Sequence, residues 1–378
     1  MNLPLFYNYL IMFNYLLKSS EIAIKGKNRS FFESILKENI SKKLKENLVY
    51  LKNLGGEFLV KTKTDTVEDL KKILGIAKII KVEIFSDLTK VEEYLKNFPY
   101  EFKLKVKRAD KTYPLTSKEI YEKLTSSLKE KIKKEGSELI LEYRDKNFYL
   151  GESHEGFGGL PVGSSGKGLV LISTGFDSPV ASFLMMKRGL KLTFLHFHSY
   201  PQTSMENIEK IKKLIKILNE FNLGSILYLI NILEIQKFYL QKVPAKYLVI
   251  FYRRTMFRLA TKLAKELKIK VLITGENLGQ VASQTINNIK VIENATDLLV
   301  LRPLIGFNKQ EIINLAEKIG TKKVSELPGE DCCSLFIPKH PETKANLYEI
   351  LKIEKQISSE LSILEEIAYK NKELEVFN

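Results

Sequence analysis

The sequence predicts an α/β protein in which a doubly wound parallel sheet occupies the C-terminal part and a smaller α+β region precedes it. From residue 168 onward, short, continuously apolar segments alternate with helical segments, which is typical of buried parallel strands joined by crossover helices. Before residue 154, helical patterns mix with strands that alternate apolar and charged residues. A chain of 378 residues is long enough for two or three domains.

Four segments define the α+β region. Residues 28–48 carry apolar side chains at helical spacing and predict an amphipathic helix. Residues 55–64 predict a strand that leaves a glycine turn, and residues 66–76 predict a second helix. Residues 102–110 predict a strand with one apolar and one cationic face.

The segment HEGFGGLPVGSSGKG, residues 154–168, is rich in Gly, Ser and Pro and predicts a domain boundary. It imitates a Walker A loop, which requires G-x-x-x-x-G-K-[ST]. Counting back from Gly166 and Lys167, the first position is Pro161, and Gly168 stands where the magnesium-binding hydroxyl belongs. A P-loop is therefore rejected.

The C-terminal part is expected to alternate strands and helices along its length. Strands are expected at 168–173, 192–199, 225–230, 270–277 and 298–304, and helices at 179–189, 205–221, 245–268, 279–288, 308–320 and at the C-terminal end. In such a sheet, ligands bind beyond the carboxyl ends of the strands.

The stretch LVLISTGFDSPVAS is a strand, a polar turn from Ser173 to Ser178 and a helix N-terminus, with Pro179 expected at the first helical position. Backbone N–H groups, the helix dipole and two hydroxyls converge at such a turn and suit a pyrophosphate group. Gly175 would allow phosphate to approach the backbone, and Asp177 makes sense if a magnesium ion bridges it to the phosphates. A capped helix without a ligand is the open alternative.

Charge and cysteine content restrict partners and compartment. Sixty Lys and Arg against forty-five Asp and Glu leave a formal charge of +15, which suits a polyanionic partner, although a lysine-rich solvated surface would have the same composition. The only cysteines, Cys332 and Cys333, are adjacent, which excludes a disulfide framework and an all-cysteine zinc site and indicates a reducing cytoplasm. The apolar start is too short for a membrane span, and Met12 is an alternative initiator.

The turn sequence SxGxDS after an apolar strand resembles the PP-motif of the N-type ATP pyrophosphatases. Eight further segments, in chain order, resemble the ThiI family of tRNA uridine 4-sulfurtransferases: SEIAIKGKNRSFFE, KVKRADKTYPLTSKEI, GGLPVGSSGK, LHFHSYPQTS, YRRTMFRLA, TGENLGQVASQT, LRPLIGFNKQEI and EDCCSLFIPKHPETK. The usual family turn is Ser-Gly-Gly, so Thr174 is a departure that adds a Cβ and a hydroxyl.

The resemblance implies three domains: a ferredoxin-like domain at 1–58, a THUMP RNA-binding domain at 59–163 and a PP-loop ATP pyrophosphatase domain at 164–378. Ser173, Gly175, Asp177 and Ser178 are expected to hold the phosphates of Mg-ATP, with Asp177 as the metal ligand. The resemblance adds further ATP contacts at Leu171, Ile172, His196, Phe197, Arg253, Gly275 and Gln284. Taken alone, His196 and His198 would be read as hydrogen-bonded core histidines, and Arg253 and Arg254 as solvated, although one arginine facing phosphate is favoured.

The family activity implied is adenylation of uridine 8 of tRNA at O4, followed by sulfur transfer from a cysteine persulfide to give 4-thiouridine. Cys332 matches the active cysteine, with Cys333 as runner-up; two buried, inert cysteines are the alternative. A rhodanese domain, which some members of the family carry, is not expected here, so sulfur is expected from a cysteine desulfurase or free sulfide. Two cysteines are too few for an iron–sulfur cluster. A zinc site is not expected.

The resemblance also implies tRNA as the partner, a homodimer and no membrane. Backbone and shape readout of RNA is expected because few aromatic residues interleave the charges. The expected RNA contacts are Lys25, Lys27, Asn28, Arg29, Lys105, Lys107 and Arg108. The alternatives are another PP-loop tRNA-modifying enzyme, such as a 2-thiouridylase or a lysidine-forming ligase, and a tRNA-binding protein with a decayed ATP site. A role in thiamine synthesis stays open.

Overall fold

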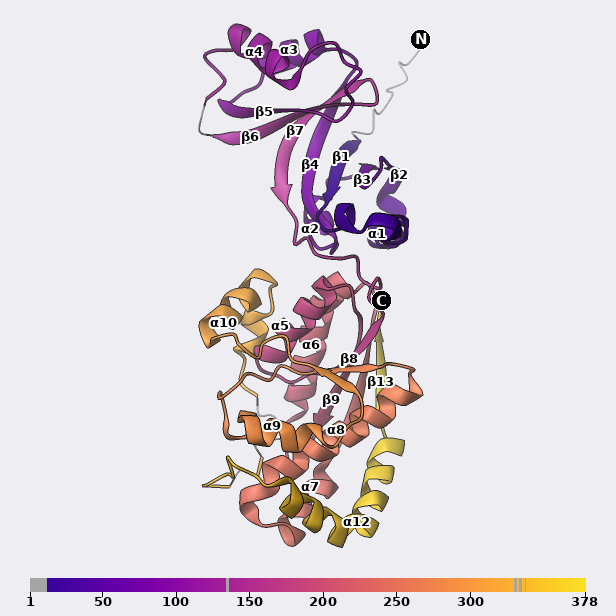
Figure 1. The fold of residues 1–378 in the computed structure, drawn as a ribbon, viewed down its shortest axis with the longest axis vertical. Coiled ribbons are helices and arrows are strands. Elements are labelled where there is room, and N and C mark those ends of the chain that lie inside the picture. The colour runs from indigo at the N-terminus through magenta and orange to yellow at the C-terminus, as the bar shows by residue number, and fades with distance from the viewer. Residues whose placement is uncertain (1–11, 134–135, 330–331, 333–334, 337) are drawn as a thin grey trace, which may run out of the picture. The chain divides into compact units, whose positions relative to one another are not determined.

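The computed structural model of the chain describes residues 12–133, 136–329, 332, 335–336 and 338–378. The chain separates into two compact units, Met1–Pro161 and Val162–Asn378 (Figure 1). The division falls within the glycine-rich segment in which a domain boundary was expected, close to the expected position after residue 163. No helix in the part of the chain that the structure describes is long and apolar enough to cross a membrane.

The first unit contains one seven-stranded sheet with the order β2-β3-β1-β4-β7-β6-β5. All its neighbouring strands are antiparallel except β5 and β6, which run parallel. The strands are β1 (Phe13–Ser19), β2 (Leu48–Asn53), β3 (Glu57–Thr62), β4 (Ile76–Phe85), β5 (Phe102–Arg108), β6 (Ser137–Arg144) and β7 (Asn147–Glu155).

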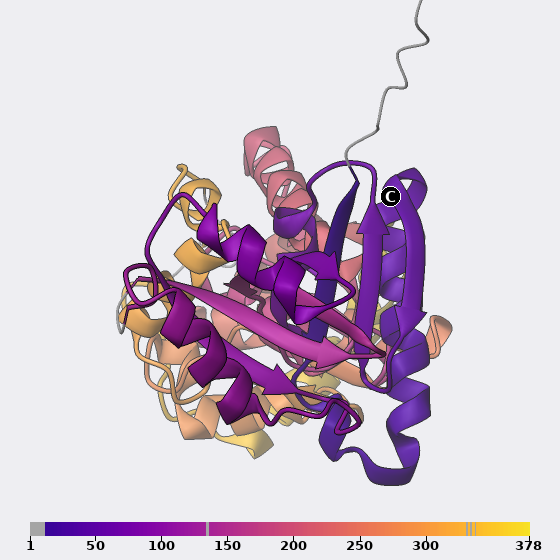
Figure 2. The same cartoon turned by 90° about the horizontal axis from the view of Figure 1, so that it is seen from above.

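Two separate cores form on this single sheet. Helices α1 (Arg29–Leu44) and α2 (Val67–Lys71) bury apolar residues against β1, β3 and the start of β4. Helices α3 (Leu88–Lys96) and α4 (Ser117–Ser127) do the same against β5, β6 and β7, and Figure 2 shows them in front of the sheet.

The boundary expected between residues 58 and 59 is therefore wrong. It passes through β3, which pairs with both β1 and β2, and it separates Phe58 from Ile79 although both belong to the same buried cluster. The next buried cluster along the chain begins only at Leu88.

Helix α1 is shorter than expected, and β2 begins at Leu48, the residue at which the expected helix would have ended. Helix α1 ends at Leu44 because Lys45 has a φ of +46°, a left-handed conformation that cannot continue a helix. A hairpin then pairs β2 with β3, and its turn is closed by the Asn53 side chain, which accepts bonds from the Gly55 and Gly56 N–H groups. Both glycines have positive φ, at +80° and +87°.

The second unit contains a six-stranded sheet with the order β12-β11-β8-β9-β10-β13. The first five run parallel, and β13 pairs with β10 in the antiparallel direction. The strands are β8 (Lys167–Leu171), β9 (Lys191–His198), β10 (Ser225–Asn231), β11 (Val271–Ile273), β12 (Leu299–Leu301) and β13 (Glu373–Phe377).

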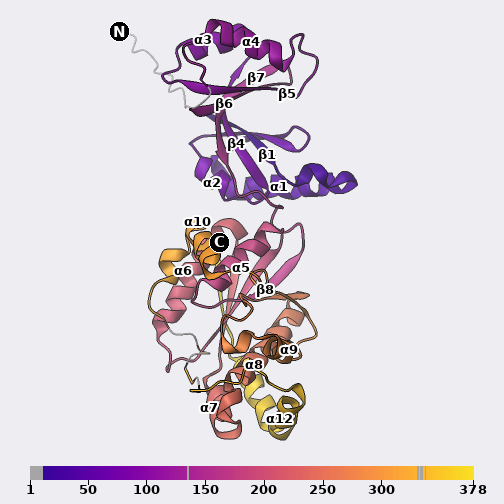
Figure 3. The same ribbon diagram turned by 60° about the vertical axis from the view of Figure 1, so that its left-hand side comes forward.

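Helices cover both faces of this sheet, so the predicted doubly wound architecture is confirmed (Figures 1 and 3). Helices α5 (Asp177–Lys187), α6 (Met205–Asn222), α10 (Lys309–Lys318) and α11 (Lys322–Ser325) form one layer, in which α5 contacts α6 and α10. Helices α7 (Leu233–Lys242), α8 (Leu248–Glu266), α9 (Ile286–Glu293) and α12 (Leu347–Lys370) form the other, in which α8 contacts α7, α9 and α12.

The prediction that the chain ends in a helix is wrong. After α12 the chain forms β13, which pairs with β10 from Ser225 opposite Phe377 to Leu229 opposite Glu373. A free strand edge on β10 offers unpaired N–H and C=O groups, and β13 satisfies them. Helix α7, which the sequence pattern did not predict, connects β10 to α8.

Candidate nucleotide and sulfur-transfer site

The turn after β8 is organised by two serine hydroxyls. Ser178 Oγ accepts a 2.8 Å hydrogen bond from the Ser173 N–H and lies 3.1 Å from Ser173 Oγ. Ser178 is itself buried, and its carbonyl accepts a 2.7 Å bond from the Ser182 hydroxyl. These contacts hold the turn closed over the start of α5, where the helix dipole is positive.

Helix α5 begins at Asp177, with Phe176 as its N-cap, so Pro179 is the third residue of the helix rather than the first. The position is still compatible with proline, because N–H groups in the first turn have no acceptor within the helix. The rejected Walker-like segment lies elsewhere: Lys167 and Gly168 are the first residues of β8, at the opposite end of that strand from the turn.

Two glycines at this turn have different physical roles. A Cβ added to Gly275 would lie 2.6 Å from the backbone nitrogen of Ser178 and 2.8 Å from the carbonyl carbon of Asp177. The segment after β11 therefore packs directly on the turn, and only glycine permits this approach. A Cβ added to Gly175 would meet only Ser173 Oγ, at 3.8 Å, so that position is open toward a ligand.

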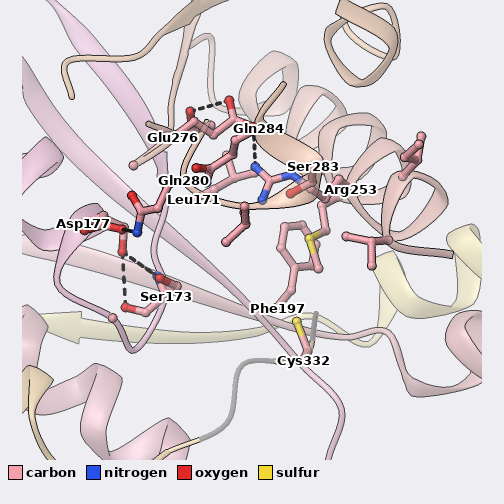
Figure 4. A pocket seen from close by; sticks show the side chains of 18 of the residues that line it. Leu171, Ser173, Asp177, Phe197, Arg253, Glu276, Gln280, Ser283, Gln284 and Cys332 are labelled. Atoms are coloured by element: carbon pink, nitrogen blue, oxygen red, sulfur yellow. Dashed lines mark hydrogen bonds and ion pairs between the residues drawn. The ribbon is translucent and has the colours of Figure 1, made fainter. Parts of the chain in front are cut away.

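A cavity of about 460 Å³ opens beside this turn, at the carboxyl ends of β8, β9 and β11. Figure 4 shows Ser173 and Asp177 at one end of it and Cys332 toward the other. Every residue expected to contact ATP lines it, and so does Cys332: Leu171, Ile172, Ser173, Gly175, Asp177, Ser178, His196, Phe197, Arg253, Gly275, Gln284 and Cys332. The structure thus brings these residues together, as the rule for open α/β sheets predicts.

The Asp177 carboxylate has two partners that the sequence analysis did not single out. Its Oδ1 lies 2.7 Å from Lys309 Nζ, at the start of α10, and its Oδ2 accepts a 3.1 Å bond from Gln280 Nε2. The Lys309 ammonium also lies over the Phe176 ring, 5.3 Å from its centroid. Lys309 thus adds a positive charge at the phosphate end of the cavity.

Arg253 lines the cavity and forms an ion pair with a buried carboxylate, that of Glu276. Its Nη2 lies 2.5 Å from Glu276 Oε1, while the other oxygen of Glu276 accepts a 2.6 Å bond from Arg302 Nε. Burial would raise the pKa of Glu276, but Arg253 and Arg302 outweigh it, so the pKa lies below its usual value and the carboxylate is charged. Neither Glu276 nor Arg302 was predicted, because only the fold brings their segments beside α8.

Arg254 has a different function from Arg253. It is buried and donates to Glu354 of α12 from Nε at 2.8 Å and from Nη2 at 2.7 Å. This bidentate pair joins α8 to α12. Of the two arginines considered in the sequence, Arg253 is therefore the one that lines the cavity.

The two histidines of β9 are buried. His196 Nδ1 lies 2.9 Å from the carbonyl oxygen of Ile172, so the ring joins β9 to the end of β8 at the cavity wall. Burial, with a contribution from His196, lowers the pKa of His198 to about 4, and the His198 ring is neutral near pH 7.

Cys332 is buried and lines the cavity. Its backbone carbonyl accepts a 2.7 Å hydrogen bond from the side-chain amide of Gln236. The runner-up, Cys333, lies outside the described residues.

Comparison with known protein families decides the identity of the chain. The family model described as "Thiamine biosynthesis protein (ThiI)" matches residues 163–359, and the model of the "ThiI ferredoxin-like domain" matches residues 14–79. The chain belongs to the ThiI family.

Individual relatives of this ThiI-family chain agree with that assignment. It is 39% identical to a "Probable tRNA sulfurtransferase" of Caldanaerobacter subterraneus, covering 90% of this chain and 94% of the relative. It is 40% identical to the protein of the same description in Coxiella burnetii, with the same coverage. The solved structure of "a 4-thiouridine synthetase - RNA complex with bound ATP" superposes with a TM-score of 0.87 at 35% identity, covering 97% of this chain and 100% of that one.

Thr174, the departure from the usual ThiI turn, is accommodated by the fold. Its side chain is buried, and it is not among the residues that line the cavity. It is also not among the residues with positive φ, so its β-branched side chain is not strained by a left-handed backbone. The added hydroxyl and methyl group therefore leave the phosphate end of the cavity open.

The expected RNA contacts of the ThiI chain form two separate groups in the first unit. Lys25, Lys27 and Asn28 precede α1, and Arg29 is its first residue. Arg29 is tied to Glu33 at 2.6 Å and to the carbonyl of Gly55. Lys105, Lys107 and Arg108 lie on β5, the edge strand at the other end of the sheet order from β2.

Not all of these cations face outward to the same extent. The Lys105 side chain is half exposed, whereas burial and nearby lysines, Lys18 first among them, lower the pKa of Lys107. Arg108 donates to the carbonyls of Tyr113 and Leu115 at 2.9 Å and 2.8 Å, so it closes the loop that follows β5.

A magnesium ion at Asp177 fits the donors that are present. Across the described ranges, no group of three or more His, Cys, Asp or Glu side chains could hold a metal ion. Unlike zinc, Mg²⁺ does not need three or more protein ligands, because it is commonly held by one or two carboxylates together with substrate phosphates and water. A single carboxylate beside a phosphate-binding turn is consistent with a metal that arrives with the nucleotide.

Proposed function

We propose that this protein is an ATP-dependent tRNA sulfurtransferase that converts uridine 8 of tRNA to 4-thiouridine. One observation carries the proposal: a single cavity holds both a phosphate-binding turn at a helix N-terminus and the thiol-bearing Cys332. A nucleotide activated at one end would thus lie within reach of sulfur chemistry at the other.

In the activation step, O4 of the uridine attacks the α-phosphorus of ATP and pyrophosphate leaves. The turn from Ser173 to Ser178 binds the departing phosphates through backbone N–H groups and the dipole of α5. Lys309 and Arg253 supply positive charge, and Asp177 would hold Mg²⁺, which neutralises phosphate charge when bound.

The apolar walls of the cavity suit the adenine base. Phe197, Met256 and Phe257 line the cavity, and all three are buried. The bond between His196 and the Ile172 carbonyl fixes the wall between the base and the phosphates. This arrangement orients ATP so that its α-phosphorus lies between the turn and the sulfur donor.

In the transfer step, a persulfide on Cys332 provides the sulfur. Its terminal sulfur forms a bond to C4 as AMP departs, and a second thiol, from Cys333 or an external thiol reductant, then breaks the S–S bond and leaves a disulfide. Alternatively, that thiol attacks the persulfide first and releases sulfide, which attacks C4. Both routes end at 4-thiouridine and AMP.

The proposal includes partners for both units. The cationic groups of the first unit would hold tRNA through its phosphates. An external cysteine desulfurase would load Cys332 by passing on the outer sulfur of its own persulfide, whereas free sulfide would attack C4 of the activated uridine directly. The enzyme would act as a homodimer in the cytoplasm, where thiols stay reduced. Sedimentation of the purified protein with and without tRNA measures the oligomeric state.

The test is an assay with unmodified tRNA transcript, Mg-ATP and sulfide, which reads 4-thiouridine by its near-ultraviolet absorbance and maps its position in the tRNA. Asp177→Asn is expected to abolish pyrophosphate release. Asp297→Asn is the matched control, because Asp297 is an exposed aspartate that also pairs with a lysine. Sulfur placed at another uridine, or at C2, would favour a 2-thiouridylase instead.

A further inference from the structure

Gln236 forms a buried hydrogen-bonded link between the sheet and Cys332. It lies on α7, and its side chain is fully buried. Its Nε2 donates to the carbonyl oxygen of Cys332 at 2.7 Å, and its Oε1 accepts from the hydroxyl of Ser199 at 2.5 Å. Because each end of the amide has a partner of the opposite type, its orientation is determined.

Ser199 ties this link to the nucleotide cavity. It follows directly after β9, the strand that also carries the cavity residues His196 and Phe197, and it is fully buried. Its backbone N–H is bonded to the Thr203 hydroxyl at 3.2 Å, so it is fixed at both its backbone and its side chain. Any displacement of Gln236 relative to β9 would break a buried hydrogen bond and leave buried polar atoms without their partner.

The chain that leads to Cys332 is held at a second point. Lys210 of α6 is buried, and its ammonium donates to the carbonyls of Ser325 and Leu327 at 3.0 Å and 2.5 Å. A Cβ added to Gly329 would lie 2.7 Å from Asn207 Oδ1, so this segment lies directly against α6. A buried lysine bonded to two carbonyls strongly fixes the backbone that it binds.

The same segment contacts the phosphate-binding turn. Ser325 is buried and donates its hydroxyl to the carbonyl of Gly175 at 3.3 Å. Two hydrogen-bonded connections thus link the chain around Cys332 to the walls of the cavity. One runs through Ser325 to the turn, and the other runs through Gln236 to the end of β9. The Ser325 connection ends on Gly175, a residue expected to touch ATP, whereas the Gln236 connection involves no such residue.

We propose that Gln236 is a positioning residue for sulfur transfer: by holding the Cys332 carbonyl, it directs the Cys332 thiol into the cavity that holds the activated uridine. This inference rests on the function proposed above, in which Cys332 carries the sulfur. It assigns Gln236 no part in adenylation, because its side chain bonds to Ser199 and Cys332 and does not line the cavity.

The test compares two reactions of the full-length enzyme, with sulfur supplied by a cysteine desulfurase and cysteine so that it passes through Cys332. Gln236→Met keeps the length of the side chain and removes both hydrogen bonds. We expect 4-thiouridine formation to fall by about 10- to 100-fold, the loss that misplacing a reacting group by about 1 Å causes. We expect tRNA-dependent pyrophosphate release to stay within about 2-fold of wild type. Gln241→Met is the matched control, since Gln241 is exposed on the same helix.

A third readout does not depend on catalysis. In a Cys333→Ser background, Cys332 is the only thiol, and the rate of its alkylation by iodoacetamide reports how it is held. Gln236→Met is expected to change this rate by about 3-fold or more while the protein stays folded by circular dichroism. Ser199→Ala, which removes only the bond that orients Gln236, is a milder variant and should shift both readouts in the same direction.

The possible outcomes separate the inference from the function on which it rests. Unchanged sulfur transfer and unchanged alkylation in Gln236→Met would overturn the inference, and so would an equal loss of both reactions, which is the result for a merely structural residue. A wild-type protein that makes no 4-thiouridine would overturn the proposed function, and the alkylation rate would still decide whether Gln236 holds Cys332.

Discussion

The ammonium group of Lys309 lies 2.7 Å from Oδ1 of Asp177, although 132 residues separate the two in the chain. Asp177 is the first residue of α5, where the helix dipole favours an anion, and Lys309 begins α10 in the same layer of helices. The pair therefore places one negative and one positive group together at the phosphate end of the cavity. We expect Lys309 to exchange its carboxylate partner for phosphate oxygens when a nucleotide binds.

Replacement of this lysine should therefore impair ATP cleavage more than folding. Lys309→Met removes a positive charge from the site of the departing pyrophosphate, and we expect kcat for pyrophosphate release to fall by about 100-fold. The Lys309 side chain is about half exposed, so the melting temperature should change little. Lys318→Met, at the exposed end of the same helix, is the control. Equal activity of the two variants would contradict the assignment.

Replacing the two glycines at the turn should affect stability and ATP binding differently. Gly275→Ala forces a Cβ against the backbone of Ser178 and should lower the free energy of unfolding by about 1–3 kcal/mol and abolish pyrophosphate release. Gly175→Ala meets no close neighbour, so its free energy of unfolding should stay within about 0.5 kcal/mol while its KM for ATP rises. Urea unfolding and steady-state kinetics of both variants measure this. A large stability loss in Gly175→Ala would contradict the packing described for the turn.

Glu276→Gln should destabilise the protein in a pH-dependent way. Glu276 lies buried between Arg253 and Arg302, and removing its charge takes the shared carboxylate from two largely buried arginines, at a cost of about 3 kcal/mol at pH 7. Because the pKa of Glu276 is lowered in the folded state, its stabilisation is present above the unfolded pKa near 4.5 and is lost as pH falls through the folded value.

Urea unfolding of wild type and Glu276→Gln at a series of pH values measures this effect. The stability gap between them should narrow below about pH 4.5. Glu234→Gln, an exposed partner of Lys237, should show no such gap. A gap that is independent of pH would indicate that the carboxylate is not charged.

His198 should make the protein less stable on mild acidification. The pKa of its buried ring is lowered to about 4 from the unfolded value of 6.5, so the unfolded state takes up a proton first as pH falls. This single group should remove about 3 kcal/mol of stability as pH falls from 6.5 to 4. A titration followed by NMR should place the midpoint of His198 near 4, and His198→Gln should have a shallower decline of stability in this range.

The cations of the first unit should divide into those that bind RNA and those that hold the fold. Lys27→Ala and Lys105→Ala remove exposed charges and should weaken tRNA binding. Each should also reduce the slope of log affinity against log salt concentration by about 1, because one fewer phosphate is neutralised. Arg108→Ala should instead lower stability, because it frees the carbonyls of Tyr113 and Leu115. Filter binding over a range of salt concentrations, with thermal melts of each variant, measures both effects.

Much of the nucleotide site could be predicted because its components are local. An apolar strand followed by STGFDS identifies a turn and a helix start from adjacent residues, and the rule that ligands bind at the carboxyl ends of parallel strands places the other ATP residues on the same side. The resemblance to the ThiI family supplied the remaining positions. The spacing of apolar residues likewise predicted most strands and helices of the second unit, since each of these elements buries apolar side chains whose pattern is visible within its own segment.

Tertiary structure decided the features that depend on a distant partner. Strands β2 and β13 form because β3 and β10 offer them free edges, and the core around Phe58 crosses the expected domain boundary because one sheet continues through it. The pairing of Lys309 with Asp177, the position of Glu276 between two arginines and the bond from Gln236 to Cys332, 96 residues away, have no local signature. The physical reason is that periodicity reports only which face of an element is buried. Which side chains then meet depends on how the packed elements align, and that is determined only when the whole core forms.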